Sequence, residues 1–231
     1  MSTEQNTEPE PAQRGPLMRL WGRCFAALYG PLLRRTERRG NAKRRQTLLE
    51  SAQGRVVELG AGTGHNLEHY PDGVELVLTE PHGPMARRLR ERLARSGREA
   101  EVLEEPAEHL PLPDNSADTV VSTLVLCTVD DVDATLSEAR RILRPGGRLL
   151  FLEHVAAAEE GRLQRWQDRA HGFWHGFAYG CNTNRRTEAA IRGAGFEVDE
   201  LIVDELEFDI PLIRPLIWGH AHAPLDADAP A

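Results

Sequence analysis

Between residues 55 and 153, short apolar runs alternate with segments whose apolar residues recur at helical spacing. The runs are bounded by glycine, proline or acidic residues, which is typical of strands buried on both faces of a parallel sheet. An alternation of strands and helices predicts βαβ units and hence a doubly wound α/β sheet. The expected strands are Arg55–Leu59, Val74–Thr79, Ala100–Leu103, Asp118–Thr123 and Arg148–Glu153.

The segments between these runs have the pattern of amphipathic helices. Met85, Leu89 and Leu93 stand four residues apart among arginines, so they form one apolar stripe. A second stripe ends at Leu143, and the run Arg144-Pro145-Gly146-Gly147 that follows stops a helix. Further along the chain we expect helices over about 161–178 and 186–194, and final strands over 196–203 and 212–218.

Length and cysteine content bound the class of protein. A chain of 231 residues suits one domain with extensions. No apolar run reaches the ~18–20 residues of a membrane span, and the polar first residues lack the apolar core of a signal peptide. Three cysteines, Cys24, Cys127 and Cys181, are too few for a disulfide framework and predict a reducing, cytoplasmic location.

The charge is distributed unevenly along the chain. Residues 11–45 carry nine arginines and Lys43 against the single acid Glu37, although the formal net charge of the whole chain is −8. The acidic remainder argues against nucleic acid as a partner. Apolar residues interleave with the arginines, so residues 15–45 predict an amphipathic helix. This helix either makes peripheral contact with an anionic membrane or packs on the neighbouring domain with its arginines solvated.

The most informative motif is a glycine-rich turn after the first expected strand. Gly60, Gly62 and Gly64 follow the strand at alternate positions, and we expect the turn to open a helix. A dinucleotide loop has a different spacing, with a small residue where this chain has His65.

Two acidic residues sharpen the interpretation of this turn. Glu58 precedes the first glycine by two residues, and its carboxylate would repel a pyrophosphate but attract a cation. Glu80 ends the second expected strand, where a carboxylate binds a ribose diol in such folds. The site therefore suits a positively charged nucleoside such as S-adenosylmethionine.

These segments resemble motifs of the class I S-adenosylmethionine-dependent methyltransferases. The similar segments are Glu58–Gly64, Glu80-Pro81, Ala107–Asp114 and Arg144–Leu149. The resemblance implies a Rossmann-like, doubly wound, seven-stranded sheet whose last strand is antiparallel, and the sequence pattern adds N-terminal helices before it. It implies these cofactor-binding residues: Glu58, Gly60, Ala61, Gly62, Gly64, Asn66, Glu80, Pro81, Met85, Ala107, Glu108, Thr123 and Leu124.

Further segments are similar to methyltransferase-like proteins that methylate alkyl thiols. They are Thr123–Val129, Glu153–Ala157, Gly180-Cys181-Asn182 with Arg185, and Arg214–Gly219. This resemblance implies a small-molecule acceptor, most concretely a thiol. The alternatives are oxygen, nitrogen or carbon acceptors of quinone-like or lipid head-group substrates. Animal members carry an apolar N-terminal anchor, where this chain has its basic segment.

Composition, periodicity and the resemblance together divide the chain into segments. We expect a disordered tail over residues 1–14 and a basic, amphipathic, helical segment over 15–51. The methyltransferase domain then spans 52–222, with a helical insert at about 160–185, and 223–231 form a flexible tail.

The candidate catalytic groups are histidines. His154 directly follows the fifth expected strand, at the carboxyl edge where open α/β sheets bind ligands. His175 shares a helix face with His171, and the three aromatic residues nearby could form an acceptor pocket: Phe173, Trp174 and Phe177. Each histidine could instead be a surface or capping residue. Cys181 is typical of a small side chain that fills buried space, and Asn182 is typical of an N-cap residue for the next helix.

Several alternatives remain at this point. The pair His65 and His69 lacks the adjacent glutamate of a zincin, and no cysteine pair has zinc spacing, so we predict no metal site. A dinucleotide-dependent oxidoreductase and a non-catalytic nucleoside-binding module are the competing function classes. The sequence leaves the acceptor and the oligomeric state open.

Overall fold

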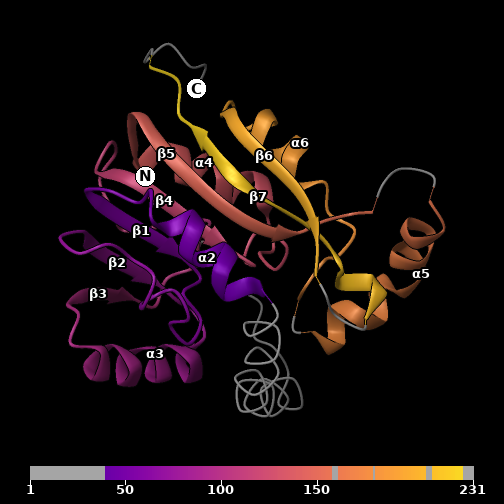
Figure 1. Ribbon diagram of the computed structural model, residues 1–231, viewed down its shortest axis with the longest axis horizontal. Helices are drawn as coiled ribbons and strands as arrows, with labels where there is room; N and C mark the ends of the chain where they lie inside the picture. Colours follow the sequence, from indigo (N-terminus) through magenta and orange to yellow (C-terminus); the bar gives the residue numbers. More distant parts are fainter. Residues whose placement is uncertain (1–39, 158–160, 179, 207–209, 226–231) are drawn as a thin grey trace, which may run out of the picture.

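The computed structural model describes residues 40–157, 161–178, 180–206 and 210–225. In these residues a seven-stranded sheet has the strand order β3-β2-β1-β4-β5-β7-β6 (Figure 1). The strands are β1 (Arg55–Leu59), β2 (Glu75–Thr79), β3 (Ala100–Leu103), β4 (Ala117–Thr123), β5 (Leu143–His154), β6 (Glu197–Glu205) and β7 (Pro215–His222).

The sheet is mixed, with its antiparallel part at one edge. Strands β1 to β5 pair in parallel, and Val57 of β1 lies opposite Val77 of β2 and Val120 of β4. Strand β7 runs antiparallel between β5 and β6. The predicted doubly wound sheet with an antiparallel last strand is therefore confirmed. Because the strand order reverses between β1 and β4, their carboxyl ends border the crevice where such sheets bind ligands.

Helices cover both faces of the sheet. They are α2 (Ala42–Leu49), α3 (Gly83–Ser96), α4 (Val132–Ile142), α5 (Arg162–Phe177) and α6 (Thr187–Gly193), with a short 3-10 turn η2 (Pro211–Ile213). One core cluster packs α4 and α6 on the sheet, and the other packs α2 and α3 on the opposite face. The adjacent residues Val56 and Val57 belong to different clusters, as expected for a strand buried on both sides.

Helix α5 agrees with the helix predicted over 161–178. Figure 1 shows this helix beyond the end of β5, to one side of the sheet. Its buried residue Gln167 donates to the carbonyls of Val155, Thr183 and Leu212 and accepts from the amide of Ala157. One glutamine thus joins the helix to three separate segments of the main chain.

One predicted helix does not form in the described residues, and another is described only in part. The glycine turn does not open a helix, since residues 62–69 form consecutive turns. Gly62 and Gly64 have φ values of +59° and +80°, which a right-handed helix cannot contain. The helical segment predicted over residues 15–51 is described only as α2, because residues 1–39 lie outside the described ranges.

Most of the basic segment and of the two predicted tails lies outside the residues that the structure describes. Residues 1–39 include the predicted acidic tail and most of the basic segment, and residues 226–231 include most of the second tail. Within the four described ranges, no helix combines the length and the apolarity needed to cross a bilayer.

Candidate cofactor and acceptor site

The glycine turn leaves open space at its centre. Gly60, Gly62 and Gly64 all have positive φ, a conformation that side chains with a Cβ rarely adopt. A Cβ added to Gly60 would lie 2.8 Å from a methyl of Val125, and one added to Gly64 would lie 2.8 Å from a methyl of Leu67. At Gly62 the nearest atom would be 3.9 Å away. A ligand can therefore approach the main chain most closely at Gly62.

Glu80 lies directly against this turn. Its Oε2 accepts a hydrogen bond from the amide of Gly62 at 2.8 Å, and its Oε1 accepts one from the amide of His82 at 2.9 Å. Burial raises the pKa of this carboxyl above its ordinary value, although both amides act in the opposite direction. A carboxylate has about four acceptor positions, so Glu80 retains capacity for two further donors such as a ribose diol.

Glu58 lies in a buried polar network behind the turn. Its side chain accepts hydrogen bonds from the side-chain amide of Asn66 at 2.8 Å and from the hydroxyl of Tyr70 at 2.7 Å. Arg45 of α2 donates to Asn66 Oδ1 at 2.7 Å and to Thr123 Oγ1 at 2.8 Å. The network thus joins the N-terminal helix, the glycine turn and the end of β4.

The environment of Glu58 raises the pKa of its carboxyl toward neutral pH. Burial raises the pKa of this carboxyl to about 7, against smaller lowering effects of the Tyr70 hydrogen bond, the Arg45 charge and the Asn66 hydrogen bond. Burial therefore favours the protonated form of Glu58 up to a pH well above the range in which an ordinary carboxyl ionises. A cationic ligand nearby would favour the ionised form.

Sequence reasoning missed Arg45 and Tyr70. Both sequence alternatives placed the arginines of the basic segment at the surface, in solvent or at an anionic membrane, yet Arg45 is 4% exposed and hydrogen-bonded to two buried polar groups. A single arginine within a run of basic residues gives no local signal that it points inward. Tyr70 follows the turn by several residues, and its hydroxyl is recognised as a partner only once the chain has folded back on β1.

The other predicted cofactor residues occupy varied environments. Thr123 is bonded to Asn66 at 3.0 Å, which places it in the network around Glu58. Glu108 instead accepts from the amides of Asp130 and Asp131, just before α4. Leu124 has a φ of +62°, an uncommon value for a side chain with a Cβ. Ala61, Met85 and Ala107 are buried and Pro81 is exposed.

A second buried glutamate organises the end of β4. The Glu153 side chain is fully buried and accepts four hydrogen bonds. The donors are the Ser122 hydroxyl and the amides of Val125, Leu126 and Cys127, at 2.7 to 3.3 Å. Burial raises the pKa of this carboxyl, and the four donors lower it by less. Glu153 therefore fixes the turn that follows Leu124.

His154 lies at the carboxyl end of β5, as predicted from its position in the sequence. It is 9% exposed, and burial lowers the pKa of its imidazole to about 4, although a hydrogen bond with the backbone of Ile213 raises it slightly. The ring is therefore neutral at pH 7. Its Nδ1 has no hydrogen-bond partner in the described part of the chain.

The predicted aromatic acceptor pocket on α5 is not formed as expected. Phe173 is 77% exposed and stacks on Phe177, which is 48% exposed. His175 is exposed on the same helix, with its ring 5.8 Å from that of His171. Helical spacing placed these residues correctly relative to one another, but it could not show which face of α5 is buried, and the buried residue of this helix is Gln167.

Asn182 also differs from its prediction. Its side-chain amide donates to the carbonyls of Cys127 at 3.1 Å and Gly180 at 3.0 Å. The next helix, α6, has Arg186 at its N-cap position. Asn182 therefore stabilises a loop–loop contact and does not cap the helix.

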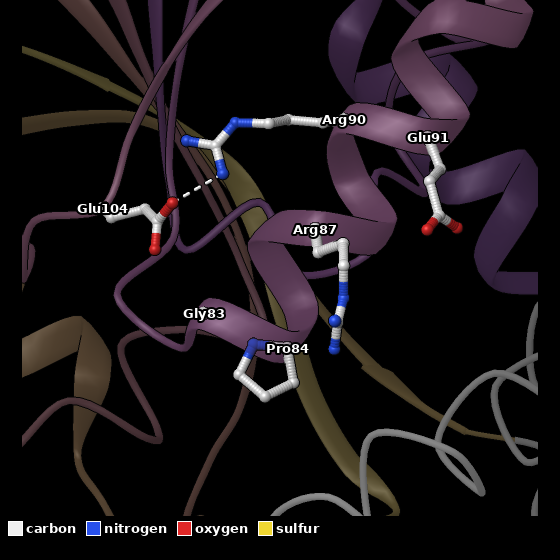
Figure 2. Close-up of a pocket in the computed structure, with 6 residues that line it drawn as sticks. All are labelled: Gly83, Pro84, Arg87, Arg90, Glu91 and Glu104. Atoms are coloured by element: carbon white, nitrogen blue, oxygen red, sulfur yellow. Dashed lines mark hydrogen bonds and ion pairs between the residues drawn. The ribbon is translucent and has the colours of Figure 1, made fainter.

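A separate surface hollow lies along the outer side of α3. Figure 2 shows it with Arg90 directed toward Glu104, and their side chains form an ion pair at 2.5 Å. Its lining residues are Gly83, Pro84, Arg87, Arg90, Glu91 and Glu104. None of them belongs to the predicted cofactor set.

The fold and the glycine turn with its adjacent acid are those of a nucleoside-binding α/β transferase, and comparison with known proteins identifies the family. A family model described as a methyltransferase domain matches residues 57–151. The chain is 34% identical over 169 residues to the thiol S-methyltransferase TMT1A of Homo sapiens, covering 72% of this chain and 69% of that protein. The chain belongs to the class I S-adenosylmethionine-dependent methyltransferases.

Other similar proteins have different acceptors in their names. A crystal structure from Thermotoga maritima, described as a possible histamine N-methyltransferase, has a TM-score of 0.65 and 25% identity, and covers 89% of this chain and 99% of its own. A phosphatidylethanolamine N-methyltransferase of Cereibacter sphaeroides is 32% identical over 130 residues, 53% of this chain and 63% of that protein. The family assignment sets the dinucleotide-dependent oxidoreductase aside.

Proposed function

We propose that this small-molecule methyltransferase transfers its methyl group to a thiol. The observation that carries the proposal is the similarity to a human thiol S-methyltransferase, which extends over most of the chain and beyond the cofactor motifs. When bound, S-adenosylmethionine supplies a methyl group attached to a positively charged sulfur.

We assign the cofactor to the crevice between the ends of β1, β2 and β4. The residues there fit such a group, because the main chain is open at Gly62 and Glu80 retains acceptor capacity beside it. Glu58 contributes negative charge behind the turn, and its pKa near 7 lets a cation hold it in the ionised form. The full predicted set adds Gly60, Ala61, Gly64, Asn66, Pro81, Met85, Ala107, Glu108, Thr123 and Leu124.

We assign the acceptor to the neighbouring ends of β4 and β5. Methyl transfer is an in-line displacement, so alignment of the acceptor and exclusion of water supply much of the rate. Glu153 fixes the turn at this edge through four hydrogen bonds, and a fixed turn can hold an acceptor in one orientation.

His154 is the catalytic group that we favour at this edge. Its Nδ1 is buried and has no hydrogen-bond partner in the described part of the chain, and an S–H group that reached this atom would supply the missing hydrogen bond. A pKa of about 4 makes the His154 imidazole a weak base. The imidazole therefore orients the thiol, and the thiol proton passes mainly to water. His175 remains the second candidate. Because a free thiol has a pKa of about 8.5, methyl transfer should then accelerate as the pH rises toward that value.

The test is release of S-adenosylhomocysteine, measured by mass spectrometry with matched alkyl thiols, amines, phenols and quinols. Product with thiols alone supports the proposal. Product with amines or quinols alone overturns the thiol assignment and favours the alternative of nitrogen, oxygen or carbon acceptors, including lipid head groups. S-adenosylmethionine binding without turnover on any acceptor would favour a non-catalytic module.

We also propose a cytoplasmic location with peripheral membrane contact through residues 15–45. The support is the density of arginines interleaved with apolar residues in this segment. The test is co-sedimentation of the full chain with vesicles that contain anionic lipid. Replacement of Arg34, Arg35, Arg38 and Arg39 by serine should abolish co-sedimentation, and unchanged co-sedimentation would refute the proposed contact.

A further inference from the structure

Two cysteines far apart in the sequence meet at the edge of the acceptor region. Cys127 lies in the turn after β4, and Cys181 lies in the loop after α5. Their sulfur atoms are 3.8 Å apart. We propose that Cys127 and Cys181 form a dithiol site that reacts with low-molecular-weight disulfides and closes into a reversible intramolecular disulfide.

The main chain already holds the two segments together. The amide of Asn182 donates to the carbonyl of Cys127 at 2.6 Å, and the side chain of Arg185 donates to the carbonyl of Val129 at 3.0 Å. On the opposite side, Glu153 accepts a hydrogen bond from the amide of Cys127. A disulfide requires the sulfurs to approach to about 2.05 Å. Because the backbones are joined next to both cysteines, side-chain rotation can supply most of that approach.

The two thiols differ in access and acidity. Cys127 is 1% exposed, whereas Cys181 is partly exposed. The hydrogen bond with Cys127 lowers the pKa of Cys181, although burial opposes this, and the same contact together with burial raises the pKa of Cys127. Thiolates are the reactive form of cysteine, so Cys181 is the attacking group and Cys127 the resolving group.

The reaction balances with a disulfide as the oxidant. The Cys181 thiolate attacks one sulfur of a disulfide RSSR, which forms a mixed disulfide and releases RS⁻. The Cys127 thiolate then attacks the Cys181 sulfur and releases the second RS⁻. The two protons of the cysteines pass through solvent to the released thiolates. Two cysteine thiols are thus oxidised to one disulfide while RSSR is reduced to two RSH.

The experiment uses the full chain, fully reduced and then exposed to glutathione disulfide. The reaction is quenched in acid, and remaining thiols are counted by N-ethylmaleimide uptake in intact-mass spectrometry. Since the chain has three cysteines, we expect wild type to change from three labels to one, with a digest showing a Cys127–Cys181 linked peptide. Retention of three labels, or a link through Cys24, would overturn the proposal.

Variants test the order of attack and provide a matched control. Cys24→Ser should close the disulfide at the wild-type rate. Cys127→Ser should accumulate one stable glutathionyl group on Cys181. Cys181→Ser should react with glutathione disulfide at least about 10-fold more slowly than wild type. A glutathionyl group that persists on wild type would show that Cys127 does not resolve it. The wild-type label count decides the proposal even if a Cys127 variant fails to fold.

Discussion

Two buried glutamates lie on opposite sides of the point where the strand order reverses, and they are used differently. Glu58 on β1 accepts from the side chains of Asn66 and Tyr70, whereas Glu153 on β5 accepts from three main-chain amides and one hydroxyl. Side-chain donors can rotate when a ligand arrives, but main-chain donors move only if the backbone moves. The β1 side is therefore the adjustable part of the site, and the β5 side is its rigid part.

The largest effect should come from the rigid side. Glu153→Ala leaves three amides and the Ser122 hydroxyl without their acceptor in a buried location, and we expect a loss of about 4 kcal/mol in the free energy of unfolding. Urea unfolding followed by tryptophan fluorescence measures it. Glu200→Ala, at an exposed acid on β6, is the matched control and should cost less than about 0.5 kcal/mol. If Glu153→Ala lowers the free energy of unfolding by less than about 1 kcal/mol, the β5 side is not the rigid part of the site.

The next effect concerns the pH dependence of stability on the adjustable side. The folded-state pKa of Glu58 is raised from 4.5 to about 7, so the folded chain binds this proton more tightly than the unfolded chain does. The stability that Glu58 contributes is present below pH 4.5 and is lost as the pH rises to about 7, by about 3 kcal/mol. Glu58→Gln should remove this loss.

Urea unfolding at a series of pH values checks this prediction as the difference between wild type and Glu58→Gln. The other titrating groups, including Glu153, are common to both proteins and cancel in the difference. Parallel curves for the two proteins between pH 4.5 and 7 would show that Glu58 does not titrate in this range.

The third effect is on cofactor affinity. Glu80→Ala removes the acceptor of the Gly62 amide and the proposed ribose ligand, and we expect binding weaker by about 2 kcal/mol. Calorimetric titration with S-adenosylmethionine measures it. Glu104→Ala is the control, because this exposed acid pairs with Arg90 outside the predicted site. Equal affinity for wild type and Glu80→Ala would refute the ribose assignment.

The smallest effect is on turnover at the edge of β5. His154→Ala should lower kcat with a thiol by about 10-fold, as expected for one lost hydrogen bond, with cofactor affinity unchanged. Since burial lowers the pKa of His154 to about 4, the ring does not titrate between pH 6 and 9. The pH midpoint of the rate should therefore follow the pKa of the acceptor thiol in both proteins. A midpoint that moves in the variant would show that His154 acts as the titrating base.

Sequence analysis predicted well the features that depend on neighbouring residues. It predicted poorly the features that depend on residues far apart in the chain. The bounds of β1 and β3 agree with the runs that predicted them, because a short strand is specified by residues next to one another in the sequence. The contact of Gly62 with Glu80 follows from two local motifs at adjacent strand ends. The helix expected after the turn is wrong, because the local signal could not show that the glycines adopt positive φ. The exposed Phe173 shows that helical spacing alone does not define the buried face of α5.

The sequence by itself determined the α/β class, the strand that leads into a glycine turn, and the acid that ends the next strand, since each is specified by residues next to one another. Only the tertiary structure decided that Arg45 is buried against Asn66 and Thr123, and that Cys127 meets Cys181. These contacts join residues 21, 78 and 54 positions apart. The physical reason is that a polar side chain or a thiol has no periodic pattern of its own, so its partner is set by how the sheet brings distant strand ends together.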